Sequence, residues 1–274
     1  MYAYTKDEVL LRVDNVSLSF GNTPILRDIN VTIQNIKRPD VIEGQVVGLL
    51  GPSGVGKTQL FRIIAGLQEP TKGQVLLGEK GAPVKVGQVG VVAQHYPLFK
   101  HRTVLDNLMV AGKQAGMNNA KAKDKAIELL RRFNLESHAG YFPVQLSGGQ
   151  RQRVAIAQQL ICSENFLLMD EPFSGLDPLM KEEVCKLIIQ VSRMDEKNTI
   201  IITTHDISTA IEVADTLVVL GFERDTANNV VPGARVRAVY DLIQRELAWH
   251  PDIKNLPQFS QVVREVSELF KSLK

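Results

Sequence analysis

The sequence predicts an α/β protein built on a mostly parallel sheet. Two observations carry this prediction. Continuous apolar runs of strand length stand at residues 46–50 and 166–169, and residues 199–203 are three isoleucines between two threonines, which is typical of strands buried on both faces. Helix-like stretches separate these runs, and strands that alternate with helices favour a parallel, right-handed sheet.

The residues before the first buried strand are predicted to form an antiparallel β-region. Apolar residues recur over 11–20 and stop at Gly21-Asn22, and apolar and polar residues alternate over 29–33. Alternation of this kind indicates strands with one buried face. Arg38-Pro39-Asp40 predicts a turn before the run at 46–50.

The next stretch predicts a helix and then several short strands. The helix is expected over 59–65, where Gly66 would cap its C-terminal end. Residues 70–93 are rich in valine and punctuated by glycine, which favours strands with turns at 72–73, 79–81 and 86–87.

The middle of the chain changes to helical character. Helices expected over 103–135 and 149–161 predict a helical subdomain of about residues 100–160, inserted between two strands of the sheet. Further elements are expected to complete a domain of residues 1–222: helices at 179–194 and 207–214, and a strand at 216–220. Residues 223–274 are predicted to be a helical tail with amphipathic helices at about 238–249 and 258–273, suited to packing or subunit contact.

Composition and charge indicate a globular protein and give no reason to expect a nucleic-acid partner. The chain has 274 residues, of which 44% are hydrophobic and 23% charged, as in globular proteins. The net charge of +2 gives no reason to expect a nucleic-acid partner. No uncharged apolar run reaches 18 residues and no secretory signal stands at the N-terminus, so we expect a soluble intracellular protein. The two cysteines, Cys162 and Cys185, are expected to be buried and reduced.

A phosphate-binding loop follows the first buried strand. Its residues match the pattern G-x-x-x-x-G-K-[ST]: Gly51, Pro52, Ser53, Gly54, Val55, Gly56, Lys57 and Thr58. Glycines let backbone N–H groups approach phosphate oxygens, and the following helix offers its positive end. Lys57 would contact the β- and γ-phosphates and the Thr58 hydroxyl would bind Mg²⁺. The sequence therefore predicts a P-loop NTPase core that binds a nucleoside triphosphate with Mg²⁺.

Two carboxylates end the second buried strand. Ligands of open α/β sheets bind beyond the carboxyl ends of strands, so Asp170 is placed to hold Mg²⁺ through water. Glu171 comes one residue later, where it can polarise a water for attack on the γ-phosphate. The alternative is a surface turn. No Asn-Lys-x-Asp segment is present to select guanine, so ATP is preferred over GTP.

Further segments carry a family resemblance. Residues Leu146, Ser147, Gly148, Gly149 and Gln150 open a helix, Gln94 follows a strand, Ser174–Asp177 follows Glu171, and His205 follows the third buried strand. In this order and spacing, the chain resembles the nucleotide-binding subunit of ABC transporters over about residues 10–221.

The resemblance implies a role for each matching position. Gln94 would reach the Mg²⁺ or the attacking water and connect to the membrane partner. The signature, Leu146–Gln150, would bind the γ-phosphate of ATP held by the other subunit. This implies a head-to-tail homodimer, or a pseudo-homodimer of two similar cassettes, that encloses two ATP molecules. Asp177 would line that dimer interface and His205 would contact the γ-phosphate.

Phe20 has two possible roles, and three glutamines depart from the family pattern. Phe20 stands where an aromatic residue stacks on adenine, although a core role in an alternating strand is the alternative. Gln59 replaces a second Ser or Thr that helps to bind the α-phosphate, and its amide can still donate. Gln158-Gln159 stand where an Arg-Ala pair is frequent.

The resemblance also implies a function and partners. We expect an ATPase subunit of a multi-subunit ABC transporter at the cytoplasmic face of the membrane, with an integral membrane permease and a solute-binding protein. Residues 98–99 and 103–108 are similar to cassettes that import polar amino acids, so import of a small polar solute such as an amino acid is expected. Nitrate or sulfonate cassettes, an exporter or lipid-system cassette, and a non-transport ATPase are the alternatives. Residues 96–99 are expected to form a groove for a helix of the permease.

Overall fold

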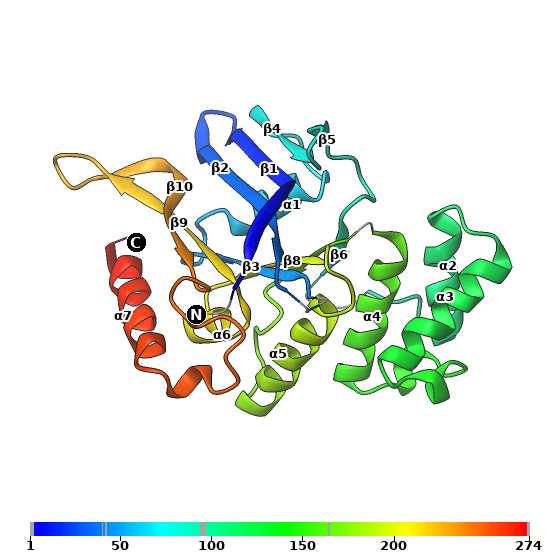
Figure 1. Ribbon diagram of the computed structural model, residues 1–274. Coiled ribbons are helices and arrows are strands. Elements are labelled where there is room, and N and C mark those ends of the chain that lie inside the picture. The colour runs from blue at the N-terminus through cyan, green and yellow to red at the C-terminus, as the bar shows by residue number, and fades with distance from the viewer. Residues whose placement is uncertain (1–2, 40, 42, 94–96, 164, 273–274) are drawn as a thin grey trace.

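The chain folds around one ten-stranded sheet. The computed structural model describes residues 3–39, 41, 43–93, 97–163 and 165–272. The strands lie in the order β5-β4-β1-β2-β10-β9-β3-β8-β7-β6, with helices packed around them (Figure 1). The strands are β1 (Thr5–Phe20), β2 (Thr23–Lys37), β3 (Gln45–Leu50), β4 (Lys72–Leu77), β5 (Ala82–Pro83), β6 (Gly90–Val92), β7 (Phe166–Asp170), β8 (Thr199–Thr204), β9 (Thr216–Arg224) and β10 (Val230–Asp241). The helices are α1 (Lys57–Ile64), α2 (Val104–Gln114), α3 (Asn119–Arg132), α4 (Gly148–Cys162), α5 (Pro178–Ser192), α6 (Ile207–Val213) and α7 (Pro257–Ser272), with short 3₁₀ turns at Glu136–His138, Pro143–Gln145 and Ile253–Asn255.

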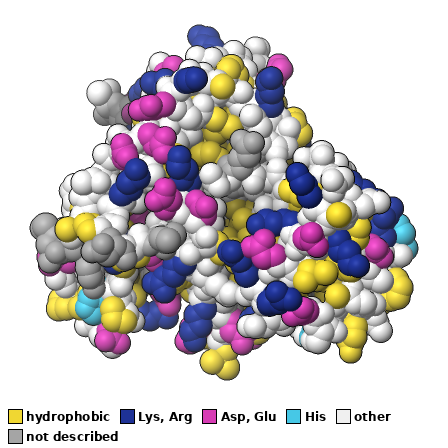
Figure 2. Space-filling model, turned by 45° about the vertical axis from the view of Figure 1, so that its right-hand side comes forward, with side chains coloured by type: hydrophobic (Ala, Val, Ile, Leu, Met, Phe, Trp, Pro, Cys, Tyr) yellow, Lys and Arg dark blue, Asp and Glu magenta, His cyan; other side chains and the backbone are white. Residues whose placement is uncertain are grey.

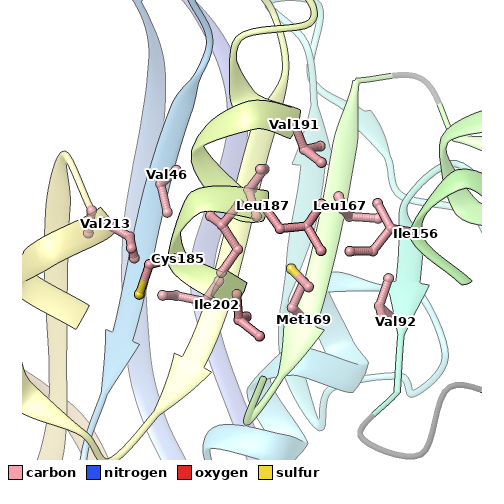
Figure 3. Packing of buried hydrophobic residues seen from close by; sticks show 14 of the residues in the cluster. Val46, Val92, Ile156, Leu167, Met169, Cys185, Leu187, Val191, Ile202 and Val213 are labelled. Carbon is pink, nitrogen blue, oxygen red and sulfur yellow. The ribbon is translucent and has the colours of Figure 1, made fainter. Parts of the chain in front are cut away.

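The predicted parallel core is confirmed. Strands β9, β3, β8, β7 and β6 all pair in parallel. Their side chains alternate between two buried clusters, because successive residues of a strand point to opposite faces. One face packs against α4, α5 and α6, where Leu187 and Val191 meet Leu167 and Ile202 (Figure 3). The other face packs against α1 and the N-terminal strands.

The predicted antiparallel region is also confirmed, and it is part of the same sheet. Strands β1 and β2 form a hairpin, and β4 and β5 extend it on the side of β1. On the other side, β10 joins this region to the parallel core, since it pairs with β9 along its length and meets β2 at Ala234 and Leu26.

The helix predicted over 238–249 is wrong. These residues begin inside β10, which is antiparallel to β9 after a turn in which the Asp225 carboxylate accepts the backbone N–H of Asn229. Cross-strand hydrogen bonds to β9 satisfy the backbone, while Ala238 and Tyr240 pack on the core. Strand β9 also crosses the predicted domain boundary at residue 222. The second tail helix is confirmed as α7, which lies beside α6 (Figure 1).

The turn predicted at residues 72–73 is wrong as well, while the turns at 79–81 and 86–87 are confirmed. Gly73 lies inside β4 with a φ of 79°, at an irregularity in the pairing of β4 with β1. A Cβ atom there would lie 2.3 Å from the carbonyl oxygen of Asn15. This glycine therefore marks a close approach of two backbones within the sheet.

The helical stretch predicted over 103–135 consists of two helices. They are separated at Gly116, whose φ of 79° ends α2. Together with α4 they form an arm between β6 and β7, hereafter the helical arm (Figure 1, green). Among the residues that the structure describes, no helix is both long and apolar enough to span a bilayer.

Candidate nucleotide-binding site

The phosphate-binding loop joins β3 to α1 and is shaped by its glycines. Gly54 and Gly56 have φ angles of 83° and 94°, in the left-handed region that favours glycine. A Cβ atom on Gly51 would lie 2.8 Å from the carbonyl oxygen of Leu220 on β9. Helix α1 begins directly after Gly56 without a side-chain cap, so its first N–H groups remain available to an anion.

The ammonium group of Lys57 lies inside this loop. Lys57 is 7% exposed, and its Nζ donates to the carbonyl oxygens of Gly51 at 2.8 Å and Pro52 at 3.2 Å. The same atom lies 3.6 Å from Oε1 of Glu171. Burial lowers the pKa of Lys57, and the charge of Glu171 opposes that shift. A second anion within reach of this cation would further favour its charged form.

Glu171 connects the loop to His205. One carboxylate oxygen faces Lys57, and the other, Oε2, lies 3.0 Å from Nδ1 of His205. The backbone N–H of Glu171 donates to the carbonyl oxygen of Thr203, and the residue has a φ of 46°. Non-glycine residues in this left-handed region are strained and cluster at functional sites. The three residues predicted to act on the γ-phosphate are therefore in contact.

Asp170 is placed beside them by a hydroxyl that the sequence analysis missed. The Thr203 Oγ1 donates to the Asp170 carboxylate, and it accepts the Glu171 N–H at 3.1 Å. Thr203 is the second-last residue of β8, and β8 pairs with β7. The rule that ligands bind beyond the carboxyl ends of strands, which placed Asp170 at this edge of the sheet, could therefore also have found Thr203.

The donor set around Asp170 fits Mg²⁺ held together with phosphate. Thr58 is exposed at the start of α1, and Asp170 is only partly buried. Among the described residues no group of three or more His, Cys, Asp or Glu could form a metal cage. Mg²⁺ in nucleotide sites is commonly held by one or two protein oxygens plus phosphates and waters, so this small set suffices. Gln94, the third predicted ligand, lies outside the described residues.

The signature lies at the start of α4. The Ser147 Oγ accepts the N–H of Gln150, whose side chain in turn accepts the N–H of Ser147, a reciprocal cap. Gly148 and Gly149 have open space where a Cβ would stand. In the described part of the chain, no hydrogen bond or ion pair joins this helix end to the phosphate-binding loop.

The remaining predicted residues lie at the end of β1, within α1 and at the N-terminal end of α5. Phe20 is 52% exposed at the end of β1, and Gly56 lies close to Ile25 near the start of β2. The exposed ring rules out the core alternative for Phe20. The Gln59 Oε1 is buried and has no hydrogen-bond partner among the described residues. Asp177 caps α5 by accepting the N–H of Met180.

Gln158 and Gln159, which stand where an Arg-Ala pair is frequent, connect α4 to neighbouring elements by hydrogen bonds. The Gln159 side chain accepts the N–H of Val91 on β6 at 3.0 Å, and the Gln158 amide donates to the carbonyl oxygen of Asn107 at 3.4 Å. Both contacts are structural links between α4 and its neighbours.

A groove of about 510 Å³ runs beside the signature. It is lined by Pro97, Leu98, Lys100, Pro143, Val144, Gly148, Gly149, Arg151, Gln152, Leu176 and Met180. Buried Asn107 fixes one wall, because its side chain accepts the N–H of Phe99 and donates to the carbonyl oxygens of Phe99 and Thr103. Figure 2 shows hydrophobic side chains in the notch beside the helical arm, which comes forward on the right. Tyr96, predicted to help form such a groove, lies outside the described residues.

Known proteins resemble this chain along most of its length. The sulfate/thiosulfate import ATP-binding protein CysA 2 of Rhizobium meliloti is 39% identical over 217 residues, which cover 77% of this chain and 57% of that protein. The CysA protein of Escherichia coli is 41% identical over 219 residues, again 77% of this chain and 57% of the relative. The chain thus spans less than two thirds of the length of these curated relatives. Both relatives are named for sulfate and thiosulfate import, and the resemblance to cassettes that import amino acids stays a prediction.

Solved structures share the fold. CbiO1 from Clostridium perfringens, part of an ABC transporter complex, superposes with a TM-score of 0.72 at 24% identity and covers 95% of this chain and 100% of its own. An ATP-binding subunit of an ABC transporter gives a TM-score of 0.66 at 25% identity, over 94% and 99% of the two chains. The family described as ABC transporter matches residues 35–174, which contain the phosphate-binding loop, the signature and the Asp170-Glu171 pair. The chain belongs to the ABC transporter family.

Proposed function

We propose that this chain is the ATP-hydrolysing subunit of an ABC importer. The observation that carries the proposal is the Glu171 carboxylate, which faces Lys57 on one side and His205 on the other. Glu171 would serve as the base, Lys57 as the cation and His205 as the switch histidine. Together, beyond the ends of parallel strands, they are suited to the attack of water on a terminal phosphate.

Glu171 and ATP compete for the same partners in this arrangement. The Glu171 carboxylate lies 3.6 Å from the Lys57 ammonium and 3.0 Å from His205 Nδ1. Triphosphate in the loop draws Lys57 onto its β- and γ-oxygens and His205 onto the γ-phosphate. Glu171 is thereby released to orient a water and to accept its proton. Bound Mg²⁺, held by Thr58 and Asp170, would supply charge neutralisation at the phosphates.

The proposal includes a homodimer. The helix end at the signature offers N–H groups and two glycines with open space beside them, which an anion from a second copy could occupy. A second copy placed head to tail brings each signature to the other copy's ATP and keeps twofold symmetry. Exposed Phe20 would stack on the adenine in each site. The Gln59 amide would donate to the α-phosphate.

The proposal also includes a permease at the cytoplasmic face of a membrane. The groove beside the signature is apolar and concave, and Val144 on its rim is 72% exposed. A permease helix seated there would touch both the helical arm and the segment that follows Gln94. This position would let movement of the permease and closure of the ATP site influence one another.

Changing the groove tests the permease contact. We expect Val144→Asp to reduce assembly with the permease at least tenfold, because it places a charge in an apolar contact. Val86→Asp is the matched control, since Val86 is 70% exposed on a turn away from the groove. Co-purification with the permease and ATPase activity of the isolated subunit are both measured. Equal assembly of the two variants would remove the groove from this role.

The cargo is proposed from the relatives alone. Proteins named for sulfate and thiosulfate import favour a small inorganic oxyanion over an amino acid. A solute-binding protein would deliver it to the permease. The nucleotide-binding chain carries no cargo site of its own in this scheme, so the cargo is found by identifying those partners.

The Glu171→Gln variant tests the enzymatic proposal. We expect hydrolysis to fall at least about 100-fold, because the general base is lost. Affinity for ATP should be equal or higher, since the neutral amide no longer holds Lys57 as an ion pair. Phosphate release and binding of a fluorescent ATP analogue measure the two effects. Hydrolysis close to wild type would remove Glu171 from the role of base.

Capture of this variant tests the transporter proposal. Glu171→Gln protein is used with ATP and Mg²⁺ to capture partners from detergent-solubilised host membranes. A co-purifying permease and its solute-binding protein would support the importer and identify its cargo class. A permease without a solute-binding protein would favour an exporter or lipid system, and soluble partners alone would favour a non-transport ATPase.

A further inference from the structure

An ion pair that is not part of the predicted site includes the residue next to His205 in the chain. The Lys181 Nζ lies 2.5 Å from Oδ2 of Asp206, the residue that follows His205. The two side chains are 33% and 23% exposed, so the pair is largely shielded from solvent. It joins the first turn of α5 to the start of α6.

Each partner is fixed by further hydrogen bonds. The backbone N–H of Lys181 donates to the carbonyl oxygen of Asp177 at 3.0 Å. The other carboxylate oxygen of Asp206 accepts the N–H of Thr209 and caps α6. Burial alone would raise the pKa of Asp206, but hydrogen bonds from Lys181 and Thr209 hold it below its usual value. Asp206 therefore stays ionised near neutral pH.

These contacts complete a closed path of bonded and hydrogen-bonded groups that includes Asp177 and the pair of His205 and Glu171. One side runs from Asp177 through Lys181 and Asp206 to His205, and His205 contacts Glu171. The other side is the chain from Glu171 back to Asp177. This segment is folded tightly, because the Ser174 N–H donates to the carbonyl oxygen of Glu171. Displacement of Asp177 therefore changes the position of His205 unless the ion pair opens.

We propose that Lys181 and Asp206 are positioning residues that couple the placement of His205 and Glu171 to contact at Asp177. The proposal rests on the proposed function, in which Asp177 faces a second copy of the chain. Partner contact at Asp177 then sets the geometry of the reacting groups through this closed path. ATP bound to one copy alone would be hydrolysed slowly, because His205 would not be held correctly.

Substitutions at both ends of the pair test this coupling. Lys181→Met removes the charge and keeps the aliphatic stem, and Lys181→Arg restores a cation. Asp206→Asn removes the charge and keeps a residue that caps helices well. Lys186→Met is the matched control, since Lys186 lies on the same helix and its pair with Glu182 is 72% and 48% exposed.

The expected results separate positioning from mere stabilisation. Lys181→Met should lower kcat for ATP roughly 10- to 100-fold, leave KM within about threefold, and bring the Hill coefficient for ATP close to one. Lys181→Arg should recover most of kcat. Adding Asp206→Asn to Lys181→Met should cause little further loss, because both changes break one link. Lys186→Met should behave as wild type.

A second readout uses the nucleotide-free protein. Protein with isotope-labelled histidine side chains is examined by NMR. The His205 resonances are assigned as those that are missing in the His205→Gln variant. Its ring resonances should shift in Lys181→Met and not in Lys186→Met. Unchanged resonances in Lys181→Met, or unchanged kcat and Hill coefficient, would overturn the positioning role. Absence of hydrolysis by wild-type protein would instead defeat the proposed function.

Discussion

Glu171 is held in a backbone conformation that few residues other than glycine adopt. Its φ of 46° directs the carboxylate between Lys57 and His205, and the Thr203 backbone and hydroxyl hold its N–H. Strain of this kind costs roughly 1–3 kcal/mol and persists only where the surroundings enforce it. Thr203 is therefore the residue that maintains the geometry of the carboxylate that we propose as the general base.

Replacing Thr203 by valine tests whether its hydroxyl positions Asp170 and Glu171. The change keeps the shape but removes the hydroxyl that binds Asp170 and the Glu171 N–H. We expect ATP hydrolysis to fall about tenfold and stability to fall by about 1–3 kcal/mol. Thr199→Val is the control, because Thr199 is equally buried on β8 and its hydroxyl donates to the nearby carbonyl oxygen of Lys197. Phosphate release and urea unfolding report the effects, and equal loss of hydrolysis in both variants would contradict the assignment.

Site residues that belong to a local sequence pattern could be predicted from the sequence. Residues brought together only by the packing of distant elements could not. Lys57 and Glu171 follow buried strands, so local pattern and the rule of strand ends place them. Lys181 and Asp206 stand 25 positions apart on different helices, and no spacing rule brings them together. Their pairing depends on how α5 and α6 pack.

At the scale of elements, β4 owes its position to one glycine. Gly73 combines a positive φ with a backbone contact that leaves no room for a Cβ, whereas Gly78 has a φ of 68° and open space. We expect Gly73→Ala to cost at least about 3 kcal/mol, and Gly78→Ala about 1 kcal/mol. Urea unfolding of both variants measures the difference. Similar stabilities would show that β4 can move away from β1 at little cost.

The two errors at this scale have different physical origins. A glycine within a strand and a glycine in a turn look alike in sequence, because both supply a positive φ. The stretch 238–249 has mixed apolar spacing, and pairing with β9 made part of it a strand. Helices α4 and α5 begin at the capping residues Ser147 and Asp177, and α7 has a long amphipathic pattern, so these helices could be predicted.

At the scale of the whole molecule, one carboxylate ties the tail to the sheet. Asp215 is buried, its Oδ2 accepts the N–H of Val46 at 2.7 Å, and its carbonyl oxygen accepts the N–H of Leu242. The Trp249 side chain also donates to its carboxylate. Burial raises the pKa of Asp215 to about 7, so the folded protein retains a proton that the unfolded chain releases near pH 4.

This shift predicts how stability depends on pH. Between about pH 4 and pH 7 the folded state binds more protons at Asp215 than the unfolded state, so its contribution to stability falls as pH rises. The free energy of unfolding of wild type minus that of Asp215→Asn should fall by roughly 1.4 kcal/mol per pH unit across this window and level off above about pH 8. Urea unfolding at several pH values measures it, and parallel profiles would contradict the burial argument.

The junction at Leu26 and Ala234 also sets an order of events during synthesis. These two residues are neighbours in the sheet, yet more than two hundred residues separate them in the chain. At roughly 5–20 residues per second, the N-terminal hairpin waits about 10–40 s on the ribosome before its neighbouring strand is made. Its open edge is exposed for that time, and open strand edges invite pairing with other chains. The nascent chain is therefore most vulnerable to aggregation before β10 emerges, which makes early chaperone capture important for its yield.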